Sequence, residues 1–559
     1  MPVVTIRLDK LYGLLGRRIG LDELVERLAS LGLSVEEVGQ GLVKVEYNPN
    51  RPDYSSTYGV ARALSGLLGT SRGLPRYRLL NQRVTVHVGP PVQSVRPSIA
   101  CAIVRNVRLW SDDLEEFISM QEDLHWVLGR NRRVVAIGLH NLSPIKPPFR
   151  YTAVGGDEVR FIPLKAVDEM TPLEIVRDHE IGRKYAHLIS HLFPILLDSD
   201  GRVFSMPPVI NARITELKPG THDIFIDVTG LDHGKVSQTL NILATAFADA
   251  GGAVEKVSVE YPHARRTYPD LRAVRMELDT KYVNSLLGLQ LSPSDMKRLL
   301  EMSRMEARVI RKSRISVKYP PYRTDILHPV DLVEEIAIAY GYSNMEPTLP
   351  VEVTYGSLLP STEFLEKVAE IMTGLGFTEV MNLLLTNEEA EYSSLGEPET
   401  PHIGLANPAT REYTMLRTSI LPSLLHNLAS NQKNLYPQRI FEAGVVVMPS
   451  AETPERSVKR RRLAAATCHA EADYTEIRQA ADEVLRLLAV EARYLPISRP
   501  VFIEGRCASV VLDGVSVGYL GEVAPPVLER LGIGMPTAAL ELDLDEIAAG
   551  DKHLKPPSE

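Results

Sequence analysis

The sequence predicts an α+β protein made of several domains. Its 559 residues exceed the size of about 250 to 300 residues at which a single hydrophobic core usually stops growing. Apolar residues make up 44% and charged residues 24% of the chain, which is ordinary for a globular protein with sizeable cores. Stretches with apolar residues at helical spacing alternate with short strand-like stretches and turns. We therefore expect about two to four domains that each mix helices and strands.

Residues 1–75 are predicted to form an N-terminal α+β domain. The expected elements are a strand over 3–8, a helix that ends at Gly32, a strand over 42–46 and a helix that ends at Gly69. The segment 48–53, Asn-Pro-Asn-Arg-Pro-Asp, contains two prolines and two asparagines, which favour a rigid turn. The polar residues 75–90 are interpreted as a linker.

Residues 90–260 are predicted to form a second, mixed α+β domain. The expected elements are helices over 111–128 and 233–250, a hairpin over 195–211 and a strand over 224–230. Asp227 and Thr229 occupy alternate positions of that strand, so their side chains point to the same side of the sheet.

Residues 264–347 are predicted to form a small domain whose outline is winged-helix-like. Helices over 280–287 and 292–303, a strand over 310–318 and an acidic helix are expected. Neither of the first two helices has a basic face, so the outline alone does not predict DNA binding.

Residues 355–545 are predicted to form the last domain, followed by a polar tail over 546–559. The expected elements are a helix over 364–375, strands within 379–386 and 439–447, and helices over 416–432 and 474–488.

Four carboxylates stand at the start of the acidic helix: Asp325, Asp331, Glu334 and Glu335. The last three are spaced i, i+3, i+4 and therefore share one helical face. All four are hard oxygen ligands of the kind that Mg2+ prefers. Acidic residues are also favoured at the start of a helix by the helix dipole, so the pattern fits either a metal site or an ordinary helix start.

Charge and cysteine content exclude several classes of protein. The net charge of −9 argues against a surface built throughout to bind nucleic acid, so any RNA contact must be local. The three cysteines form no CxxC pair, which indicates neither a disulfide framework nor a zinc ribbon and suits the reducing cytoplasm. We expect no export signal and no membrane span. The segments 230–236 and 198–201 lack the residues that a phosphate loop or a calcium loop requires.

Five motifs in this order resemble the beta subunit of phenylalanyl-tRNA synthetase in its archaeal or eukaryotic cytosolic form. They are the segments 48–53, 205–211, 322–342, 405–425 and 518–525, and the resemblance covers nearly the whole chain. The N-terminal oligonucleotide-binding insert and the C-terminal anticodon-binding module of the bacterial form have no counterpart here.

The resemblance implies a role for each region. The last domain would be a degenerate class II synthetase core with an antiparallel sheet, since neither Phe-Arg-x-Glu nor a terminal Gly-x-Gly-x-x-Arg is present. An alpha subunit that binds ATP and phenylalanine would be its partner in an α2β2 tetramer that charges tRNA-Phe. Asp325, Asp331, Glu334 and Glu335 match the family's ligands for Mg2+, shared with the alpha subunit, which makes the small domain metal-binding.

The resemblance also implies that residues 90–260 form an editing domain that hydrolyses Tyr-tRNA-Phe. A hydrophobic pocket rejects a substrate with one extra hydroxyl by only about a hundredfold, so a second site must recognise that hydroxyl. The matching pocket residues are Leu196, Ser205, Asn211, Asp227 and Thr229. Since no Ser-His-Asp arrangement is visible, we expect hydrolysis by a positioned water. Two other functions stay open, namely a non-catalytic tRNA-binding scaffold and a free-standing aminoacyl-tRNA deacylase.

Overall fold

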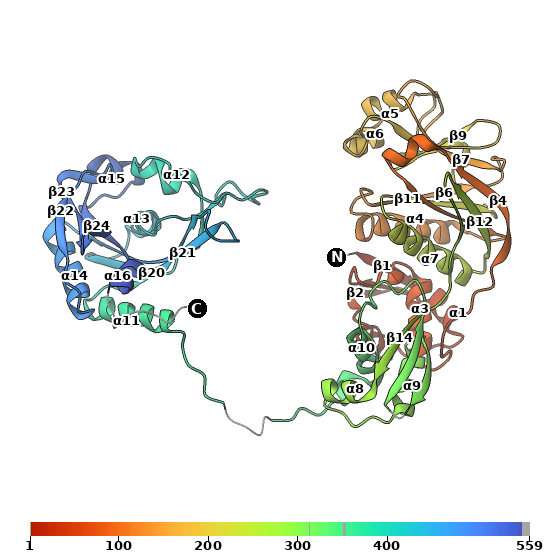
Figure 1. Cartoon of the computed structure of the whole chain (residues 1–559), viewed down its shortest axis with the longest axis horizontal. Helices are drawn as coiled ribbons and strands as arrows, with labels where there is room; N and C mark the ends of the chain where they lie inside the picture. Colours follow the sequence, from red (N-terminus) through yellow and green to blue (C-terminus); the bar gives the residue numbers. More distant parts are fainter. Residues whose placement is uncertain (1, 312, 350–353, 551–559) are drawn as a thin grey trace. The chain divides into compact units, whose positions relative to one another are not determined.

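The computed structural model describes residues 2–311, 313–349 and 354–550. The chain divides into two compact units, unit 1 (Met1–Leu349) and unit 2 (Pro350–Glu559). Figure 1 labels many of the elements of the two units, which are described separately below.

The N-terminal part of unit 1 is a small sheet with strand order β1-β3-β2, covered by helices. Its elements are β1 (Val3–Arg7), α1 (Leu8–Leu15), α2 (Leu21–Ser30), β2 (Ser34–Gly39), β3 (Leu42–Glu46) and α3 (Thr57–Leu67). Alternate strand residues such as Ile6 and Val43 meet Leu24 of α2 in a core that excludes solvent. The predicted strands over 3–8 and 42–46 and both predicted helices are confirmed, whereas α1 and β2 were not foreseen.

The rigid turn predicted over 48–53 leads into α3. Ser56 caps this helix, because its side chain accepts a hydrogen bond from the backbone N–H of Gly59. A Cβ atom on Gly59 would lie 1.7 Å from the backbone oxygen of Asp53. Only glycine therefore lets the turn pack this closely against the helix.

The centre of unit 1 is a large mixed sheet with strand order β10-β9-β8-β7-β4-β12-β5-β11-β6, and β13 pairs with β12. Its strands are β4 (Leu80–Val88), β5 (Ser98–Arg105), β6 (Val135–Asn141), β7 (Phe149–Val154), β8 (Phe193–Leu197), β9 (Val203–Met206), β10 (Ile210–Asn211), β11 (Ile224–Gly230), β12 (Ala253–Tyr261) and β13 (Ala264–Tyr268). The predicted hairpin over 195–211 and the strand over 224–230 are confirmed.

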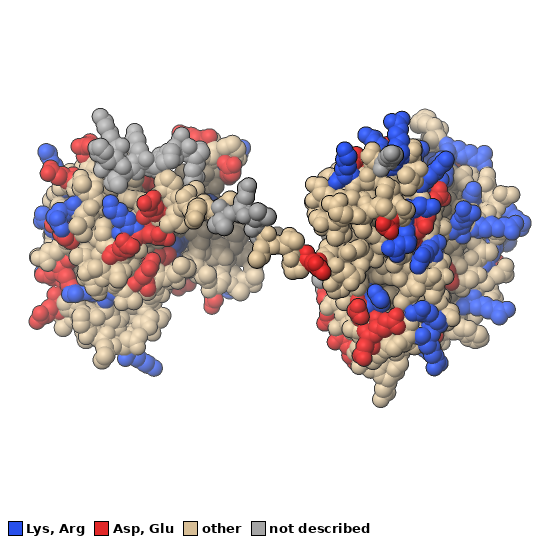
Figure 2. All heavy atoms as spheres, turned by 90° about the horizontal axis from the view of Figure 1, so that it is seen from below, with Lys and Arg blue, Asp and Glu red and all other residues tan. Residues whose placement is uncertain are grey.

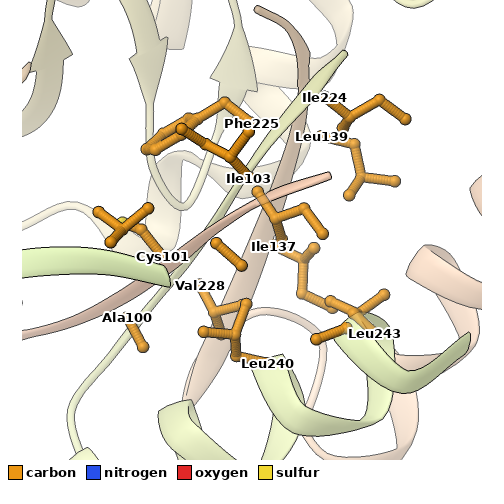
Figure 3. Close-up of a cluster of buried hydrophobic side chains, with 14 of the residues drawn as sticks. Ala100, Cys101, Ile103, Ile137, Leu139, Ile224, Phe225, Val228, Leu240 and Leu243 are labelled. Carbon is orange, nitrogen blue, oxygen red and sulfur yellow. The ribbon is translucent and has the colours of Figure 1, made fainter. Parts of the chain in front are cut away.

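Four helices accompany this sheet: α4 (Ser111–Val127), α5 (Pro172–Asp178), α6 (Glu180–Tyr185) and α7 (His233–Asp249). The predicted helices over 111–128 and 233–250 correspond to α4 and α7. Figure 3 shows the core where α7 meets the sheet, with Leu240 and Leu243 beside Val228 of β11 and Ile137 of β6. This core fixes the relative positions of β5, β11 and β6, which carry the site described below.

Two segments belong to the large sheet although the sequence assigned them elsewhere. Residues 75–90, interpreted as a linker, contain β4, which lies between β7 and β12. Residues 264–268, assigned to the start of the small domain, form β13. In β4 the buried residues Val84, Val86 and Val88 alternate with more exposed ones, a strand pattern that the polar composition of the segment obscured.

The last part of unit 1 is a three-stranded antiparallel sheet, in the order β14-β16-β15, with helices packed on it. Its elements are β14 (Val274–Asp279), α8 (Thr280–Leu287), α9 (Pro293–Met302), β15 (Glu306–Arg311), β16 (Arg314–Tyr319) and α10 (Pro329–Tyr340). The two predicted helices and the acidic helix are confirmed. The strand predicted over 310–318 is confirmed in part: residues 314–318 belong to β16, whereas residues 310 and 311 end the antiparallel strand β15.

Unit 2 is built on a sheet with strand order β17-β20-β21-β25-β24-β23-β22, in which every pair except β17 with β20 is antiparallel. Its elements are α11 (Pro360–Gly374), β17 (Thr378–Glu379), β18 (Leu385–Thr386), α12 (Glu388–Glu391), β19 (Met415–Leu416), α13 (Leu421–Ser430), β20 (Gln438–Pro449), β21 (Ser457–Cys468), α14 (Tyr474–Leu487), β22 (Arg493–Pro496), β23 (Phe502–Leu512), β24 (Val515–Val523), α15 (Pro525–Leu531), β25 (Thr537–Asp543) and α16 (Leu544–Gly550).

The predicted helices of unit 2 correspond to α11, α13 and α14, and the predicted strand over 439–447 corresponds to β20. The strands expected within 379–386 are only two short pieces, β17 and β18. Residues 546–550, assigned to the tail, form the end of α16, and residues 551–559 lie outside the described part of the chain.

Candidate functional site

A cavity of about 320 Å3 lies at the part of the large sheet where β6 and β11 pair. Its walls come from α4, β6, the loop between β9 and β10, and β11. The lining residues that matter for the argument are Gly138, Ser205, Asn211, Thr215 and Asp227. A cavity of this size falls at the lower end of the range for small-molecule sites. Three of the five residues that the sequence assigned to the pocket, Ser205, Asn211 and Asp227, line it.

The pocket carboxylate, Asp227, has a buried histidine as its partner. His140 Nε2 lies 2.7 Å from Asp227 Oδ1, and the two side chains are 0% and 1% exposed. The strand register explains the contact, because Asp227 lies opposite Gly138 in β6 and His140 is two residues further along the same face. A buried carboxylate needs such a partner to offset the loss of hydration.

Gly138 provides the space for this pair. A Cβ atom on Gly138 would lie 2.2 Å from Asp227 Oδ1 and 2.5 Å from His140 Nε2. Any larger residue would therefore displace one of the two side chains. The absence of a side chain at this position opens the floor of the cavity between β6 and β11.

Polar contacts continue on both sides of the pair. The second ring nitrogen of His140, Nδ1, lies 2.8 Å from Thr215 Oγ1. Ser205 Oγ donates to Asn211 Oδ1 over 3.0 Å, in register across β9 and β10. The cavity thus presents hydroxyl, amide and carboxylate groups beside apolar residues such as Ile137 and Leu139, which can orient a ligand that is both apolar and hydroxylated.

Leu196 and Thr229, the other two residues assigned to the pocket, do not line this cavity. Leu196 is fully buried in β8, opposite Ser205. Thr229 Oγ1 accepts a hydrogen bond from Nε of Arg96 over 3.0 Å. Burial lowers the pKa of Arg96 to about 10, and Thr229 supplies two of the acceptors that satisfy this enclosed guanidinium. In this structure Thr229 therefore contacts Arg96 and not the cavity.

Sequence reasoning did not assign His140 and Thr215 to the site, although both contribute to it. His140 was interpreted as structural or substrate-adjacent. The sequence gives one indication of its position. His140 follows Gly138 by two residues in a strand, so the two residues lie on the same face of the sheet. The pairing of β6 with β11, which brings the imidazole to Asp227, cannot be read from either strand alone.

The four acidic residues of the second predicted site are engaged in different ways. Arg323 donates to both oxygens of Asp325 over 2.9 and 2.6 Å, and to Glu335 over 2.5 Å. Asp331 Oδ2 accepts from the backbone N–H groups of Leu327 and His328 and so caps α10. Asp331 therefore supports the second alternative left open by the sequence, an ordinary helix start.

Glu334 differs from the other three. It forms no ion pair or hydrogen bond within the described parts of the chain. Partial burial raises its pKa, and the neighbouring charges of Glu335, Asp325 and Asp331 add to that increase. Burial alone would raise the pKa of Asp325 as well, but the charge and hydrogen bonds of Arg323 outweigh it and keep that pKa below its usual range.

A buried ion network joins this region to the N-terminal turn. Arg51 donates to both oxygens of Asp53 over 2.9 Å, and its Nη1 lies 3.9 Å from Glu335 Oε1. The guanidinium also stacks on Tyr54, 3.8 Å from the ring centroid. The turn over 48–53 thus contacts the acidic helix inside unit 1, although the two segments lie far apart in sequence.

The four carboxylates fit Mg2+ by donor type, but they do not form a ready-made cage. Among the described residues, no group of three or more His, Cys, Asp and Glu side chains is arranged to hold a metal ion. Asp325 and Glu335 are neutralised by Arg323, whereas Glu334 and one oxygen of Asp331 remain available. This matches the habit of Mg2+ to take one or two protein carboxylates and keep several waters.

Charge is unevenly distributed over the surface of unit 1. On the face that Figure 2 shows, Lys and Arg side chains extend along much of the outline, and Asp and Glu side chains gather in a smaller cluster. A locally basic surface can attract a polyanion although the chain has a net charge of −9.

Within the described residues, none of the helices combines the length and the apolar composition that a membrane span requires.

Comparisons with known proteins agree along nearly the whole chain. Residues 276–342 match the tRNA synthetase B5 domain, and residues 345–544 match the phenylalanyl tRNA synthetase beta chain CLM domain. The phenylalanine--tRNA ligase beta subunit of Archaeoglobus fulgidus is 41% identical over 97% of this chain and 98% of its own length. That of Methanocaldococcus jannaschii is 38% identical over 98% of this chain and 100% of its own length.

A solved structure agrees with these relatives. It is an N-terminal fragment of the phenylalanyl-tRNA synthetase beta subunit from Pyrococcus horikoshii, 38% identical to this chain. The similarity has a TM-score of 0.59 and covers 61% of this chain and 100% of the fragment.

Proposed function

The chain belongs to the family of phenylalanine--tRNA ligase beta subunits, and we propose that it acts as the beta subunit of such a ligase. In this role it supports the ATP-dependent attachment of phenylalanine to tRNA-Phe by an alpha subunit, within an α2β2 tetramer in the cytoplasm. The observation that carries this proposal is the 41% identity to a beta subunit over 97% of the chain. The locally basic face of unit 1 supports a contact with tRNA.

Unit 2 is proposed to serve as a class II synthetase core that binds the partner rather than the substrates. Its antiparallel sheet supports this interpretation. The sequence of this unit lacks Phe-Arg-x-Glu and a terminal Gly-x-Gly-x-x-Arg, so ATP and phenylalanine are assigned to the alpha subunit.

We further propose that the cavity at β6 and β11 hydrolyses Tyr-tRNA-Phe. Asp227 is the acceptor suited to a phenol hydroxyl, and Ser205 and Asn211 are further polar partners on the opposite wall. A site that forms a hydrogen bond with a substrate hydroxyl strongly rejects a substrate that lacks this hydroxyl. An apolar pocket rejects a substrate with an extra hydroxyl much less strongly. Phenylalanine would leave Asp227 buried and without that partner, so Phe-tRNA-Phe is spared.

Magnesium is proposed to bind at the start of α10. Glu334 and Asp331 would hold it directly, while Asp325 and Glu335 would contribute charge from their places beside Arg323. When bound, the ion would supply a positive charge that links these carboxylates to oxygen ligands of the alpha subunit. We assign it a structural role, because the reacting groups of aminoacylation belong to the other subunit.

Co-expression with the alpha subunit tests the main proposal. The expected result is a complex with the mass of an α2β2 tetramer that catalyses ATP–pyrophosphate exchange with phenylalanine. A chain that deacylates tRNA but binds no alpha subunit would instead be a free-standing deacylase. A chain that joins the complex but leaves Tyr-tRNA-Phe intact would be a scaffold.

The hydrolytic site has its own test. Asp227→Ala is expected to slow deacylation of Tyr-tRNA-Phe while phenylalanine charging by the complex stays unchanged. Unchanged deacylation would refute the assignment of this cavity.

A further inference from the structure

Three buried side chains form a hydrogen-bonded line along the floor of the cavity: Asp227, His140 and Thr215. The two contacts measure 2.7 Å from Asp227 Oδ1 to His140 Nε2 and 2.8 Å from His140 Nδ1 to Thr215 Oγ1. All three side chains are at most 1% exposed. Both ends of the line belong to cavity-lining residues, whereas His140 lies behind the cavity wall.

The surroundings of His140 fix how it uses its two nitrogens. Aromatic rings enclose it, with Phe204 edge-on at 5.2 Å and Phe225 at 6.2 Å between centroids. Nε2 faces a carboxylate oxygen, which can only accept, so Nε2 carries the proton and donates to Asp227. Nδ1 lies on the other side of the ring, 2.8 Å from Thr215 Oγ1.

This arrangement occupies one oxygen of Asp227 and leaves the other for a ligand. Oδ2 accepts no hydrogen bond from the described residues and is not among their fully enclosed, unpartnered polar atoms. Partial rotation of the carboxylate about its Cβ–Cγ bond would break the contact with His140. The imidazole therefore holds the carboxylate in one orientation, with Oδ2 directed away from His140.

We propose that His140 is a positioning residue for tyrosine recognition: it holds Asp227 so that its free oxygen accepts the phenol hydroxyl of the esterified tyrosine. Thr215 in turn fixes the orientation of the imidazole ring. This inference rests on the proposed hydrolysis of Tyr-tRNA-Phe. His140 itself does not touch the substrate, so its effect lies in selectivity for tyrosine and not in a general capacity for hydrolysis.

The arrangement differs from a nucleophilic triad. In such a triad the histidine takes a proton from a hydroxyl that attacks the substrate. Thr215 Oγ1 is buried and also lies 3.2 Å from the carbonyl oxygen of Ala212 and 3.4 Å from that of Phe204. These contacts anchor the hydroxyl to the backbone, which suits a support for the ring and not an attacking group.

Two substitutions at His140 separate positioning from packing. His140→Gln can place an amide N–H near the position of Nε2 and so retain the donor to Asp227. His140→Leu has a similar apolar volume but no donor. The full chain with each substitution, co-purified with the alpha subunit, is assayed for kcat/KM of deacylation with Tyr-tRNA-Phe and with Phe-tRNA-Phe. Thermal unfolding and phenylalanine charging report whether the fold is intact.

For His140→Leu we expect the preference for Tyr-tRNA-Phe over Phe-tRNA-Phe to fall at least about tenfold, as for a lost hydrogen bond that orients a charged acceptor. For His140→Gln we expect the preference to stay within about threefold of the unsubstituted chain. Equal preference in both variants and the unsubstituted chain would overturn the proposal. Equal impairment of both variants would also overturn it, because packing of the ring would then be the cause.

Thr215→Val provides a third arm. We expect a modest loss of preference, since the contact between His140 and Asp227 remains. Abolished hydrolysis of both substrates would overturn the positioning role in favour of Thr215 as a nucleophile. Failure of the underlying function is distinguishable from all these outcomes, because the unsubstituted chain would then leave Tyr-tRNA-Phe intact and Asp227→Ala would change nothing.

Discussion

Arg323 and Glu335 form an ion pair in the interior of unit 1, with Arg323 Nη2 donating to Glu335 Oε1 over 2.5 Å. The two side chains are 3% and 7% exposed. Because Arg323 also holds Asp325, one guanidinium neutralises two of the four carboxylates that the sequence assigned to a metal. The folded chain thus stabilises much of this acidic cluster without an ion.

Removing that guanidinium should be strongly destabilising. Arg323→Met removes the shared hydrogen-bond donor of two largely buried carboxylates and leaves only the longer contact of Glu335 with Arg51. Breaking a buried pair on one side costs about 3–5 kcal/mol. Chemical denaturation of the full chain, followed by a signal of unit 1, measures the change. Arg272→Met is the matched control, since Arg272 pairs with Asp270 at an exposed site and its loss should cost at most about 1 kcal/mol. Equal effects of the two substitutions would contradict the structural role of Arg323.

Glu334 allows the proposed magnesium site to be tested without disturbing the fold. Glu334→Gln removes a carboxylate that has no partner among the described residues, so the unfolding free energy should change by less than about 0.5 kcal/mol. The complex with the alpha subunit should nevertheless dissociate at a higher protein concentration and should lose its dependence on added Mg2+. The mass of the complex under dilution, with Mg2+ and with a chelator, provides the measurement. A variant complex as stable and as Mg2+-dependent as the unsubstituted one would contradict the assignment.

The sequence predicted elements better than it predicted contacts. Helices such as α4, α7 and α14 have apolar residues at a regular helical spacing, so their positions were foreseen within a few residues. The exception is β4: Val84, Val86 and Val88 alternate as in a strand, but the polar residues around them have the composition of a linker.

The candidate site shows a second limit. Asp227, Ser205 and Asn211 were grouped through the family resemblance, and the structure places all three on one cavity. The partners that determine their behaviour lie far away in sequence: His140 is 87 positions from Asp227, and Arg96 is 133 positions from Thr229. Such contacts depend on the strand order β5-β11-β6, which single-strand patterns do not encode.

Gly138 offers a direct test of the cavity floor. Gly138→Ala would bring a methyl group to 2.2 Å from Asp227 Oδ1, so the pair with His140 must shift. We expect deacylation of Tyr-tRNA-Phe to fall at least about tenfold, with a loss of stability of about 1–3 kcal/mol from overpacking. Gly13→Ala in α1 is the control, because nothing lies within 4 Å of the added methyl group, and it should leave deacylation unchanged. Full activity of Gly138→Ala would show that the pair is not needed.

The contact of α4 with the N-terminal domain should depend on pH through Asp123. Burial raises the pKa of Asp123 to about 6, although the Tyr47 hydroxyl donates to its Oδ2 over 3.3 Å and partly offsets that effect. Since the folded chain binds this proton more tightly than the unfolded chain, the contribution of Asp123 to stability is most favourable below its ordinary pKa of 3.8 and declines until the pH passes about 6.

Asp123→Asn removes the ionisation and should therefore raise the melting temperature relative to the unsubstituted chain at about pH 8, with a smaller gain at about pH 5. Thermal unfolding of both chains at the two pH values measures this difference. Glu115→Gln removes an exposed carboxylate from the same helix and should show no such pH-dependent gain. A gain for Asp123→Asn that is equal at both pH values would contradict a pKa of about 6, because the charge of Asp123 would then not change between them.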